Sequence, residues 1–270
     1  MNAIEINNLS FRYQNEKSNN GFQIDIPTWS VSKGDFTSLL GPNGCGKSTL
    51  LRLISSLHTP LSGSICIDGK NISELNRREL AKKIAYVPQT SFSLYPFSVY
   101  EIVMMGRTPY LNMMGFENKI DMEIVEEAIS LMQIEHLRQK GINELSGGEA
   151  QRVFIARALA QKAEIILLDE PNAHLDIEHQ IMIFDILQKL NNEQNITIVS
   201  VSHDLNLVGI YSKNIAFMVD GKIVTNGNKL EVLSEQNIEK IFRINSAVYS
   251  AENSSALNVL IQPLLKNKTK

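Results

Sequence analysis

The sequence predicts an α/β fold with a mainly parallel core sheet, an N-terminal antiparallel β subdomain and an inserted α-helical subdomain. Short apolar segments alternate along the chain with amphipathic helical patterns, as in strand–helix–strand units. Two segments near the N-terminus alternate apolar and polar residues, which is typical of half-buried antiparallel strands. A stretch rich in methionine and aromatic residues, with two prolines, interrupts this rhythm after residue 90.

The composition is that of a folded globular protein. The 270 residues are 43% hydrophobic and 20% charged, with a formal net charge of -3, so we expect a core and no nucleic-acid surface. The two cysteines, Cys45 and Cys66, lack the spacing of metal ligands. Neither a signal-peptide pattern nor a run of about 18 apolar residues is present. We therefore expect a cytoplasmic chain that reaches a membrane only through a partner.

The expected elements follow from the N-terminus. Residues 4–9 and 22–26 are predicted to be antiparallel strands joined by the polar loop 14–21. Candidate buried parallel strands are short and apolar: residues 36–40, 84–87, 165–168 and 197–201. Helical patterns lie between them, at residues 48–57, 122–132, 149–161 and 177–190. In the last pattern one face carries Ile177, Ile181, Phe184, Leu187 and Leu190.

We expect a single domain at residues 1–250, with a helical subdomain inserted at about residues 90–160. Residues 215–219 and 223–225 flank Asp220-Gly221, a dipeptide favoured in two-residue hairpin turns. Residues 251–270 are expected to form a C-terminal extension with a strand at 257–261.

A nine-residue segment matches G-x-x-x-x-G-K-[ST], a pattern that binds nucleotide phosphates. It consists of Gly41, Pro42, Asn43, Gly44, Cys45, Gly46, Lys47, Ser48 and Thr49. The segment follows an apolar strand and opens a helical pattern, which is the context that the motif requires. Its glycines let backbone N–H groups wrap the phosphates, Lys47 reaches the terminal phosphates, and Ser48 can coordinate Mg²⁺. The sequence therefore predicts a nucleoside triphosphate site.

The phosphate loop alone leaves the class of protein open, because GTPases and small-molecule kinases also use it. Residues 118–121 fit the NKxD pattern by which GTPases read guanine. However, they follow residues 113–117 rather than a buried strand, and no D-x-x-G lies between them and the phosphate loop. We therefore reject a GTPase.

Two adjacent carboxylates, Asp169 and Glu170, end an apolar strand pattern. Ligands of parallel sheets gather at the carboxyl ends of the strands, so we expect both side chains beside the phosphate loop. Asp169 is then placed to hold Mg²⁺ through water, and Glu170 to polarise the attacking water as a general base.

The segment 145–149 starts a second helical pattern with the Ser-x-x-Glu spacing of a capping box. This spacing does not explain Gly147 and Gly148, since glycine costs a helix about 1 kcal/mol relative to alanine. Two glycines in the first turn instead suggest a ligand pressed against the backbone.

Six short motifs in this order resemble the motif set of ABC ATPases, which are P-loop NTPases. They are the phosphate loop, Gln89, residues 145–149, residues 165–171, Asp176 and His203, and they cover most of the chain. The resemblance implies ATP and Mg²⁺ as cofactors. It also implies a head-to-tail dimer with a second copy of the chain, in which Ser146, Gly147 and Gly148 of one subunit complete the ATP site of the other.

The resemblance further implies the roles of single residues. Gln89 lies at Mg²⁺ and reports γ-phosphate occupancy to a membrane partner, His203 contacts the γ-phosphate and positions Glu170, and Asp176 links the two sites of the dimer. Tyr13 resembles the aromatic residue that stacks on adenine, with Phe11 and Trp29 as alternatives. His174 is expected at the dimer interface.

Within the family, residues 105–111 and 202–207 resemble the ATPases of importers for iron-siderophore complexes, haem and cobalamin. The resemblance implies polytopic permease subunits as partners, a peripheral location on the cytoplasmic face of the membrane, and an indirect link to an extracytoplasmic substrate-binding protein. Residues 90–116 carry only two charges, Glu101 and Arg107. We therefore expect Met105 and Tyr110 to lie on an adaptable apolar surface that receives a cytoplasmic helix of the permease.

Two other functions remain as alternatives. One is a soluble ABC ATPase that acts as an assembly or regulatory factor without a permease, and the other is the motor of an exporter. Double-cassette regulators contain two motif sets, and exporters commonly fuse the cassette to membrane spans, whereas this chain has one set and no such span. The sequence therefore favours an importer ATPase, and it does not predict the cargo, which never touches this subunit in the resembled architecture.

Overall fold

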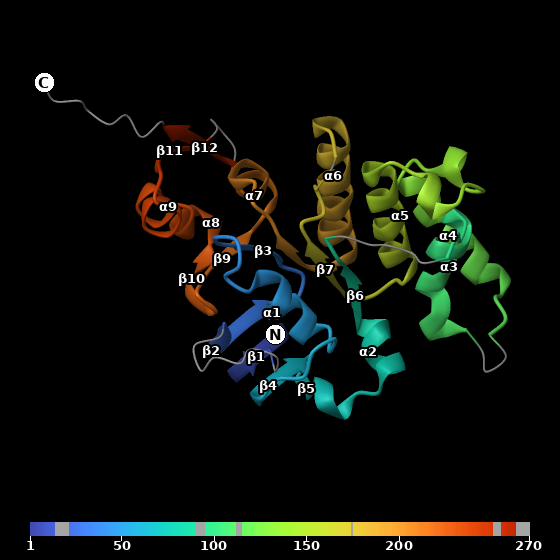
Figure 1. Cartoon of the computed structure of the whole chain (residues 1–270), viewed down its shortest axis with the longest axis horizontal. Helices are drawn as coiled ribbons and strands as arrows, with labels where there is room; N and C mark the ends of the chain where they lie inside the picture. The colour runs from blue at the N-terminus through green and yellow to red at the C-terminus, as the bar shows by residue number, and fades with distance from the viewer. Residues whose placement is uncertain (14–21, 90–94, 112–114, 174, 251–254, 263–270) are drawn as a thin grey trace, which may run out of the picture.

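The computed structural model describes residues 1–13, 22–89, 95–111, 115–173, 175–250 and 255–262. At its centre lies a six-stranded sheet in the order β10-β9-β3-β8-β7-β6 (Figure 1). Its strands are β3 (Phe36–Leu40), β6 (Ile84–Val87), β7 (Ile165–Asp169), β8 (Thr197–Val201), β9 (Asn214–Val219) and β10 (Lys222–Asn228). All neighbours pair in parallel except β10, which pairs antiparallel with β9. The predicted mainly parallel core sheet is confirmed.

The central strands β3, β7 and β8 are buried along their whole length, which explains why their sequences are mainly apolar. Successive residues of a strand point to opposite faces, so β7 serves two buried clusters. Ile165 and Leu167 pack toward helix α1 (Lys47–Ile54), whereas Ile166 and Leu168 pack toward the helical subdomain. One strand thus holds both layers of the domain together.

The N-terminal subdomain is a second, antiparallel sheet in the order β2-β1-β4-β5. Its strands are β1 (Asn2–Arg12), β2 (Gln23–Ser32), β4 (Ser62–Ile67) and β5 (Lys70–Asn71). The two strands predicted here are confirmed; β1 extends beyond its predicted bounds at both ends, whereas β2 begins one residue later than predicted and continues to Ser32. Their inward residues, such as Ile4 and Ile24, share a buried cluster with Leu50 of α1. Helix α1 is therefore packed between the two sheets.

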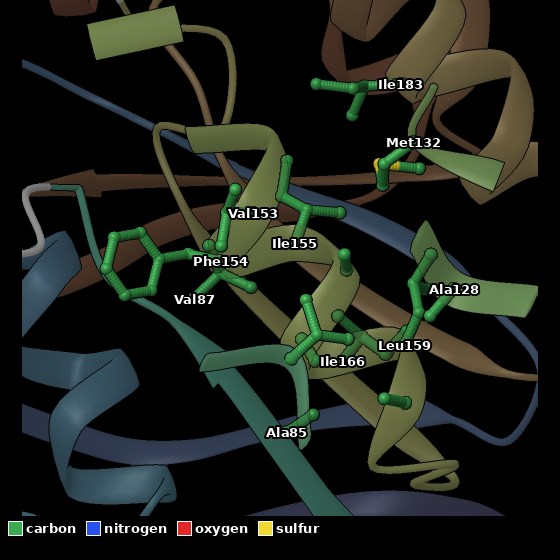
Figure 2. Close-up of a cluster of buried hydrophobic side chains, with 14 of the residues drawn as sticks. Ala85, Val87, Ala128, Met132, Val153, Phe154, Ile155, Leu159, Ile166 and Ile183 are labelled. Atoms are coloured by element: carbon green, nitrogen blue, oxygen red, sulfur yellow. The ribbon is translucent and has the colours of Figure 1, made fainter. Parts of the chain in front are cut away.

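The inserted helices lie together on one side of the core sheet (Figure 1). They are α3 (Val99–Met104), the 3-10 helix η2 (Met105–Tyr110), α4 (Lys119–Leu131), the 3-10 turns η3 (Glu135–Leu137) and η4 (Ile142–Glu144), and α5 (Gly147–Ala160). Figure 2 shows Val153 and Ile155 of α5 gathered with Val87 and Ile166 of the sheet. This apolar contact packs the middle of α5 against the strands.

Helix α6 (Ile177–Gln194) covers the same side of the sheet, and one residue of its predicted apolar face is misplaced. Phe184 and Leu187 are buried as expected, but Ile177 is 78% exposed. Ile177 follows the N-cap Asp176 directly, and this first turn does not reach the core. The prediction for Ile177 is wrong, and Ile183, absent from the predicted face, is fully buried.

The C-terminal elements lie at the opposite end of the core sheet from the inserted helices (Figure 1). The predicted hairpin turn is confirmed, since Asp220 and Gly221 have φ values of 46° and 77° between β9 and β10. The remaining elements are α7 (Leu205–Tyr211), α8 (Lys229–Val232), α9 (Glu235–Phe242), β11 (Asn245–Ser250) and β12 (Leu257–Gln262).

Strand β12 confirms the strand predicted at residues 257–261. It pairs antiparallel with β11, and Leu257 and Val259 are buried in a cluster with α7 and α9. Strand β11 ends at residue 250, inside the predicted domain, whereas β12 lies in the predicted extension. The strand of the extension therefore packs onto the domain. Of the helices that the structure describes, including the short η1 (Ile72–Glu74) and α2 (Arg77–Lys83), none has both the length and the hydropathy to span a membrane.

A buried ion pair connects η2 with two helices of the subdomain. Arg107 Nε donates to Asp121 Oδ1 at 2.9 Å, and Arg107 Nη1 donates to the carbonyl of Ala160 at 2.8 Å. Both charged side chains are almost fully buried. Asp121 also forms a capping box with Asn118 at the start of α4, so the residues of the NKxD pattern serve packing.

Replacing Asp121 by alanine should lower the free energy of unfolding by about 3 kcal/mol, because the Arg107 charge would stay buried without its partner. Denaturant unfolding followed by circular dichroism measures this loss. The control is Glu123→Ala, which breaks the exposed pair of Lys119 and Glu123 and should cost less than about 0.5 kcal/mol. Equal losses in the two variants would contradict the argument.

Candidate nucleotide-binding site

A cavity of about 770 Å³ lies beside the phosphate loop, at the carboxyl ends of the parallel strands. Its lining residues follow β1, β3, β6, β7 and β8 or precede β2: Tyr13, Phe22, Asn43, Gly44, Gly46, Lys47, Ser48, Thr49, Gln89, Glu170 and His203. Ten of the eleven are residues that the sequence analysis places in the site. The parallel pairing brings the segments after β3, β6, β7 and β8 to one edge of the core sheet, and the antiparallel sheet adds Tyr13 and Phe22.

Phe22 is the lining residue that the sequence analysis missed. It lies directly before β2, and its ring is close to the phosphate loop, since a Cβ atom on Gly46 would come within 2.6 Å of Phe22 Cζ. The signal in the sequence was an aromatic residue at the opposite end of loop 14–21 from Tyr13. Loop 14–21 itself lies outside the described residues.

The phosphate loop turns around the ammonium group of Lys47. Nζ donates to the carbonyls of Gly41 at 2.8 Å and Pro42 at 3.0 Å, and the residue is almost fully buried. Gly41 has φ 154° and packs so closely against the backbone of Met218 that a Cβ atom would clash. Burial raises the pKa of the Cys45 thiol, so this cysteine is a packed, protonated part of the loop.

The N-terminus of α1 differs from those of the other α-helices. In the described part of the chain, every α-helix from α2 to α9 begins with a side chain that accepts a hydrogen bond from its first turn. Helix α1 instead begins at Gly46, with φ 106°, and has no acidic residue in its first turn. Its first N–H groups and their partial positive charge are therefore left for an anion, as a phosphate site requires.

Glu170 stands at the meeting point of three loops. Its Oε1 atom lies 2.6 Å from His203 Nε2, and its Oε2 atom accepts a hydrogen bond of 2.7 Å from Gln89 Nε2. The residue has φ 53°, and its N–H donates to the carbonyl of Val201 at 3.1 Å. This left-handed turn aims the carboxylate into the cavity instead of along the strand.

Asp169 is the buried neighbour of Glu170 and is 1% exposed. Its Oδ1 atom accepts a hydrogen bond from Ser48 Oγ at 2.8 Å, and its Oδ2 atom accepts one from Tyr86 at 3.3 Å. Burial raises the pKa of this carboxyl, against the opposing effect of these two hydrogen bonds. A cation beside Asp169 would offset the cost of burying its charge.

The donor atoms at this point fit Mg²⁺. The hydroxyl of Ser48 and the carboxylate of Asp169 are hard oxygen ligands, and Gln89 uses its amide nitrogen on Glu170, which leaves its amide oxygen for a cation. Mg²⁺ keeps several waters and takes few protein ligands at phosphate sites. No cluster of three or more His, Cys, Asp and Glu side chains suited to another metal occurs among the described residues.

Tyr13 is the aromatic candidate that faces the cavity. Its hydroxyl lies 3.1 Å from Thr49 Oγ1 in the first turn of α1. The two alternatives, Phe11 and Trp29, are buried in the N-terminal core and do not line the cavity. Among the three, the geometry therefore favours Tyr13 for contact with a base.

The turn of Ser146, Gly147 and Gly148 does not line this cavity. Ser146 forms the capping box with Glu149, whose carboxylate accepts from the Ser146 N–H at 2.8 Å. Ser146 and Gly147 are exposed at the start of α5. Asp176 likewise lies outside the cavity lining and accepts hydrogen bonds from His179, while His174 falls outside the described residues.

Residues 24–173 match the family model described as ABC transporter. The chain belongs to this family. The predicted membership and the P-loop ATPase fold are confirmed, and the protein is an ATP hydrolase of the ABC type that binds nucleotide.

Known ABC proteins resemble the chain over most of its length. It is 34% identical over 268 residues to the iron(3+)-hydroxamate import ATP-binding protein FhuC of Bacillus subtilis, covering 99% of this chain and 98% of the relative. It is 38% identical to the ferric enterobactin transport ATP-binding protein FepC of Escherichia coli, covering 82% of each chain. The dimeric structure of a bacterial ABC transporter cassette superposes with a TM-score of 0.73 at 31% identity, covering 83% of this chain and 98% of the cassette. The predicted resemblance to iron-siderophore importer ATPases is confirmed.

Replacing Lys47 by alanine should weaken ATP binding about 10- to 100-fold, because a charge-assisted contact to the phosphates would be lost. Isothermal titration calorimetry with ATP measures the change. Lys33→Ala removes a half-exposed lysine that pairs with Glu164 far along the chain, and should leave ATP affinity unchanged. Undiminished ATP affinity in the Lys47 variant would refute its contact with phosphate.

Proposed function

We propose that this ABC ATPase powers a membrane importer for iron-siderophore complexes, haem or cobalamin, and that it works as a dimer bound to permease subunits. The observation that carries the hydrolytic part is Glu170, held between Gln89 and His203 beside the phosphate loop. The names of FhuC and FepC support the iron-siderophore cargo.

The nucleotide would bind along α1. The open helix N-terminus and Lys47 would hold the phosphates, with backbone N–H groups from the loop between Gly41 and Thr49. Tyr13 would stack on adenine, which suits its ring at the edge of the cavity. Lys47 Nζ donates to two loop carbonyls, so its third N–H would be left for a phosphate oxygen.

Ser48, Asp169 and the amide oxygen of Gln89 would hold Mg²⁺. When bound, the ion would neutralise negative charge on the β- and γ-phosphates and orient them for attack. The Ser48 hydroxyl donates to Asp169, so the two ligands are already side by side.

Glu170 would accept a proton from the attacking water. Its two carboxylate oxygens are held by the side chains of His203 and Gln89, which restricts the rotation of the carboxylate. His203 is then placed to donate to the γ-phosphate and to hold Glu170 in position, whereas Gln89, which follows β6, donates to the other carboxylate oxygen. The position of the general base would depend on both neighbours.

The ATP site would be completed by a second copy of the chain. The turn of Ser146, Gly147 and Gly148 lies outside the cavity of its own subunit, and its first two residues are exposed, as a surface that docks on a partner must be. Asp176, also exposed near the start of α6, would link the two sites. The dimeric cassette structure similar to this chain supports dimerisation, and the exposed turn of α5 is the reason to propose a head-to-tail arrangement.

The permease would dock on the helical subdomain, with the ATPase peripheral to the cytoplasmic face of the membrane and an extracytoplasmic binding protein delivering cargo. Met105 is 40% exposed and remains a candidate contact. Tyr110 is partly covered, because Arg107 lies over its ring at 4.0 Å and Lys82 lies 5.2 Å from the ring centroid. A change at Tyr110 would therefore disturb the packing of the subdomain as well as any docking.

Glu170→Gln should leave ATP bound while lowering turnover at least about 100-fold, because the amide cannot accept the proton of water. Phosphate release measures turnover, and gel filtration with ATP should show a trapped dimer. Glu164→Gln, at an exposed carboxylate outside the site, should hydrolyse ATP normally. A Glu170 variant that stays monomeric with ATP would count against the shared site.

Met105→Asp should abolish co-purification of the permease, because a charge would enter an apolar contact, while ATP turnover of the isolated chain stays unchanged. A tagged chain is purified from detergent-solubilised membranes and its polytopic partner is quantified. The control is Val224→Asp, at a half-exposed residue of β10 on the opposite end of the sheet. Retention of the permease by the Met105 variant would refute the docking surface.

A further inference from the structure

We infer that His58 and Phe11 are positioning residues, which fix the ring of Tyr13 so that helix α1 sets the distance between the base site and the phosphate site. The inference rests on the proposed stacking of Tyr13 on adenine.

The three rings form one packed aromatic group. Phe11 and His58 are stacked, with ring centroids 5.4 Å apart and an angle of 19° between their planes. Tyr13 stands edge-on to both, at 5.1 Å and 83° from Phe11 and at 5.5 Å and 86° from His58. Edge-to-face contacts at these distances are favourable beyond simple burial, so the stacked pair restrains the Tyr13 ring.

Two of the three groups that contact Tyr13 belong to α1 and its C-terminal turn, and the third, Phe11, belongs to β1. Its hydroxyl lies 3.1 Å from Thr49 in the first turn of the helix. His58 follows the end of the helix, where its N–H donates to the carbonyl of Arg52 at 3.2 Å. The helix that presents Lys47 and Ser48 to phosphates therefore also supports the aromatic ring from two sides.

The contacts of the His58 side chain point to a role in holding the rings of Phe11 and Tyr13. Its Nε2 atom is buried and has no hydrogen-bond partner among the described residues. The imidazole is therefore held in place by its contacts with the rings of Phe11 and Tyr13. A phenylalanine of similar shape should serve the same purpose, because it keeps the stack and adds no unpaired polar atom.

A ring held at both ends gives up little conformational freedom when a base stacks on it. Loosening the Tyr13 ring should thus weaken ligands that carry a base and leave the phosphate contacts intact. One aromatic contact corresponds to about a three- to tenfold change in affinity. This separates a positioning role from a general loss of structure, which would weaken every ligand.

The test is a double-variant cycle in the full chain, read by calorimetric titration with ATP and with inorganic tripolyphosphate. His58→Ala should weaken ATP about three- to tenfold and leave tripolyphosphate affinity unchanged. It should have no further effect on ATP binding when Tyr13 is already alanine, and His58→Phe should restore the original affinity. If His58→Ala lowers the Tm of the chain, His58→Leu is used in its place, because leucine keeps apolar bulk without a ring.

Three results would overturn the inference: equal weakening of both ligands, a full effect of His58→Ala in the Tyr13→Ala background, or no effect of His58→Ala while Tyr13→Ala weakens ATP. If Tyr13→Ala leaves ATP affinity unchanged, the proposed stacking itself fails, and the inference falls with it. The two failures are therefore distinguishable.

Discussion

The parallel pairing of β3, β8, β7 and β6 is the constraint on which the site depends. Parallel strands end at the same edge of a sheet, so the pairing alone places the loops that follow them side by side. These loops carry the phosphate segment, Gln89, Glu170 and His203. The pairing is maintained by strands buried on both faces, and the chemistry of the site is therefore anchored by the hydrophobic core rather than by the contacts within the site.

This edge of the core sheet carries both positive and negative groups whose charges a bound ligand would neutralise. The open N-terminus of α1 and the Lys47 ammonium attract anions, whereas Asp169 is a buried carboxyl whose pKa is raised by desolvation. A nucleotide with Mg²⁺ would supply both signs, because its phosphates suit the N-terminus of α1 and the cation suits the Asp169 carboxylate. Ser48 follows Lys47 directly in the first turn of α1, and its hydroxyl donates to Asp169, so it connects the phosphate loop with the buried carboxylate.

Much of the fold and of the candidate site could be predicted from the sequence. The same physical reasons explain which predictions failed. Fully buried strands leave short, mainly apolar segments, and the phosphate loop has a pattern with a fixed structural context, so both were predicted. Ile177 was misplaced because helical periodicity does not tell where a helix leaves the core. Phe22 was missed because its contact with Gly46 joins segments that only the fold brings together. The covered position of Tyr110 depends on Arg107 and Lys82 in the same way.

The motif around Arg107 shows how packing and coupling can share the same residues. Gly106 touches α5 so closely that a Cβ atom would clash with the Arg157 carbonyl, and Arg107 binds the carbonyl of Ala160 at the end of that helix. The segment that carries Met105 is thereby fixed to α5, whose other end presents Ser146. If the permease docks at Met105, a displacement of this surface would move α5 as a rigid body. The ends of one helix would then connect the membrane partner with the turn that completes the neighbouring ATP site.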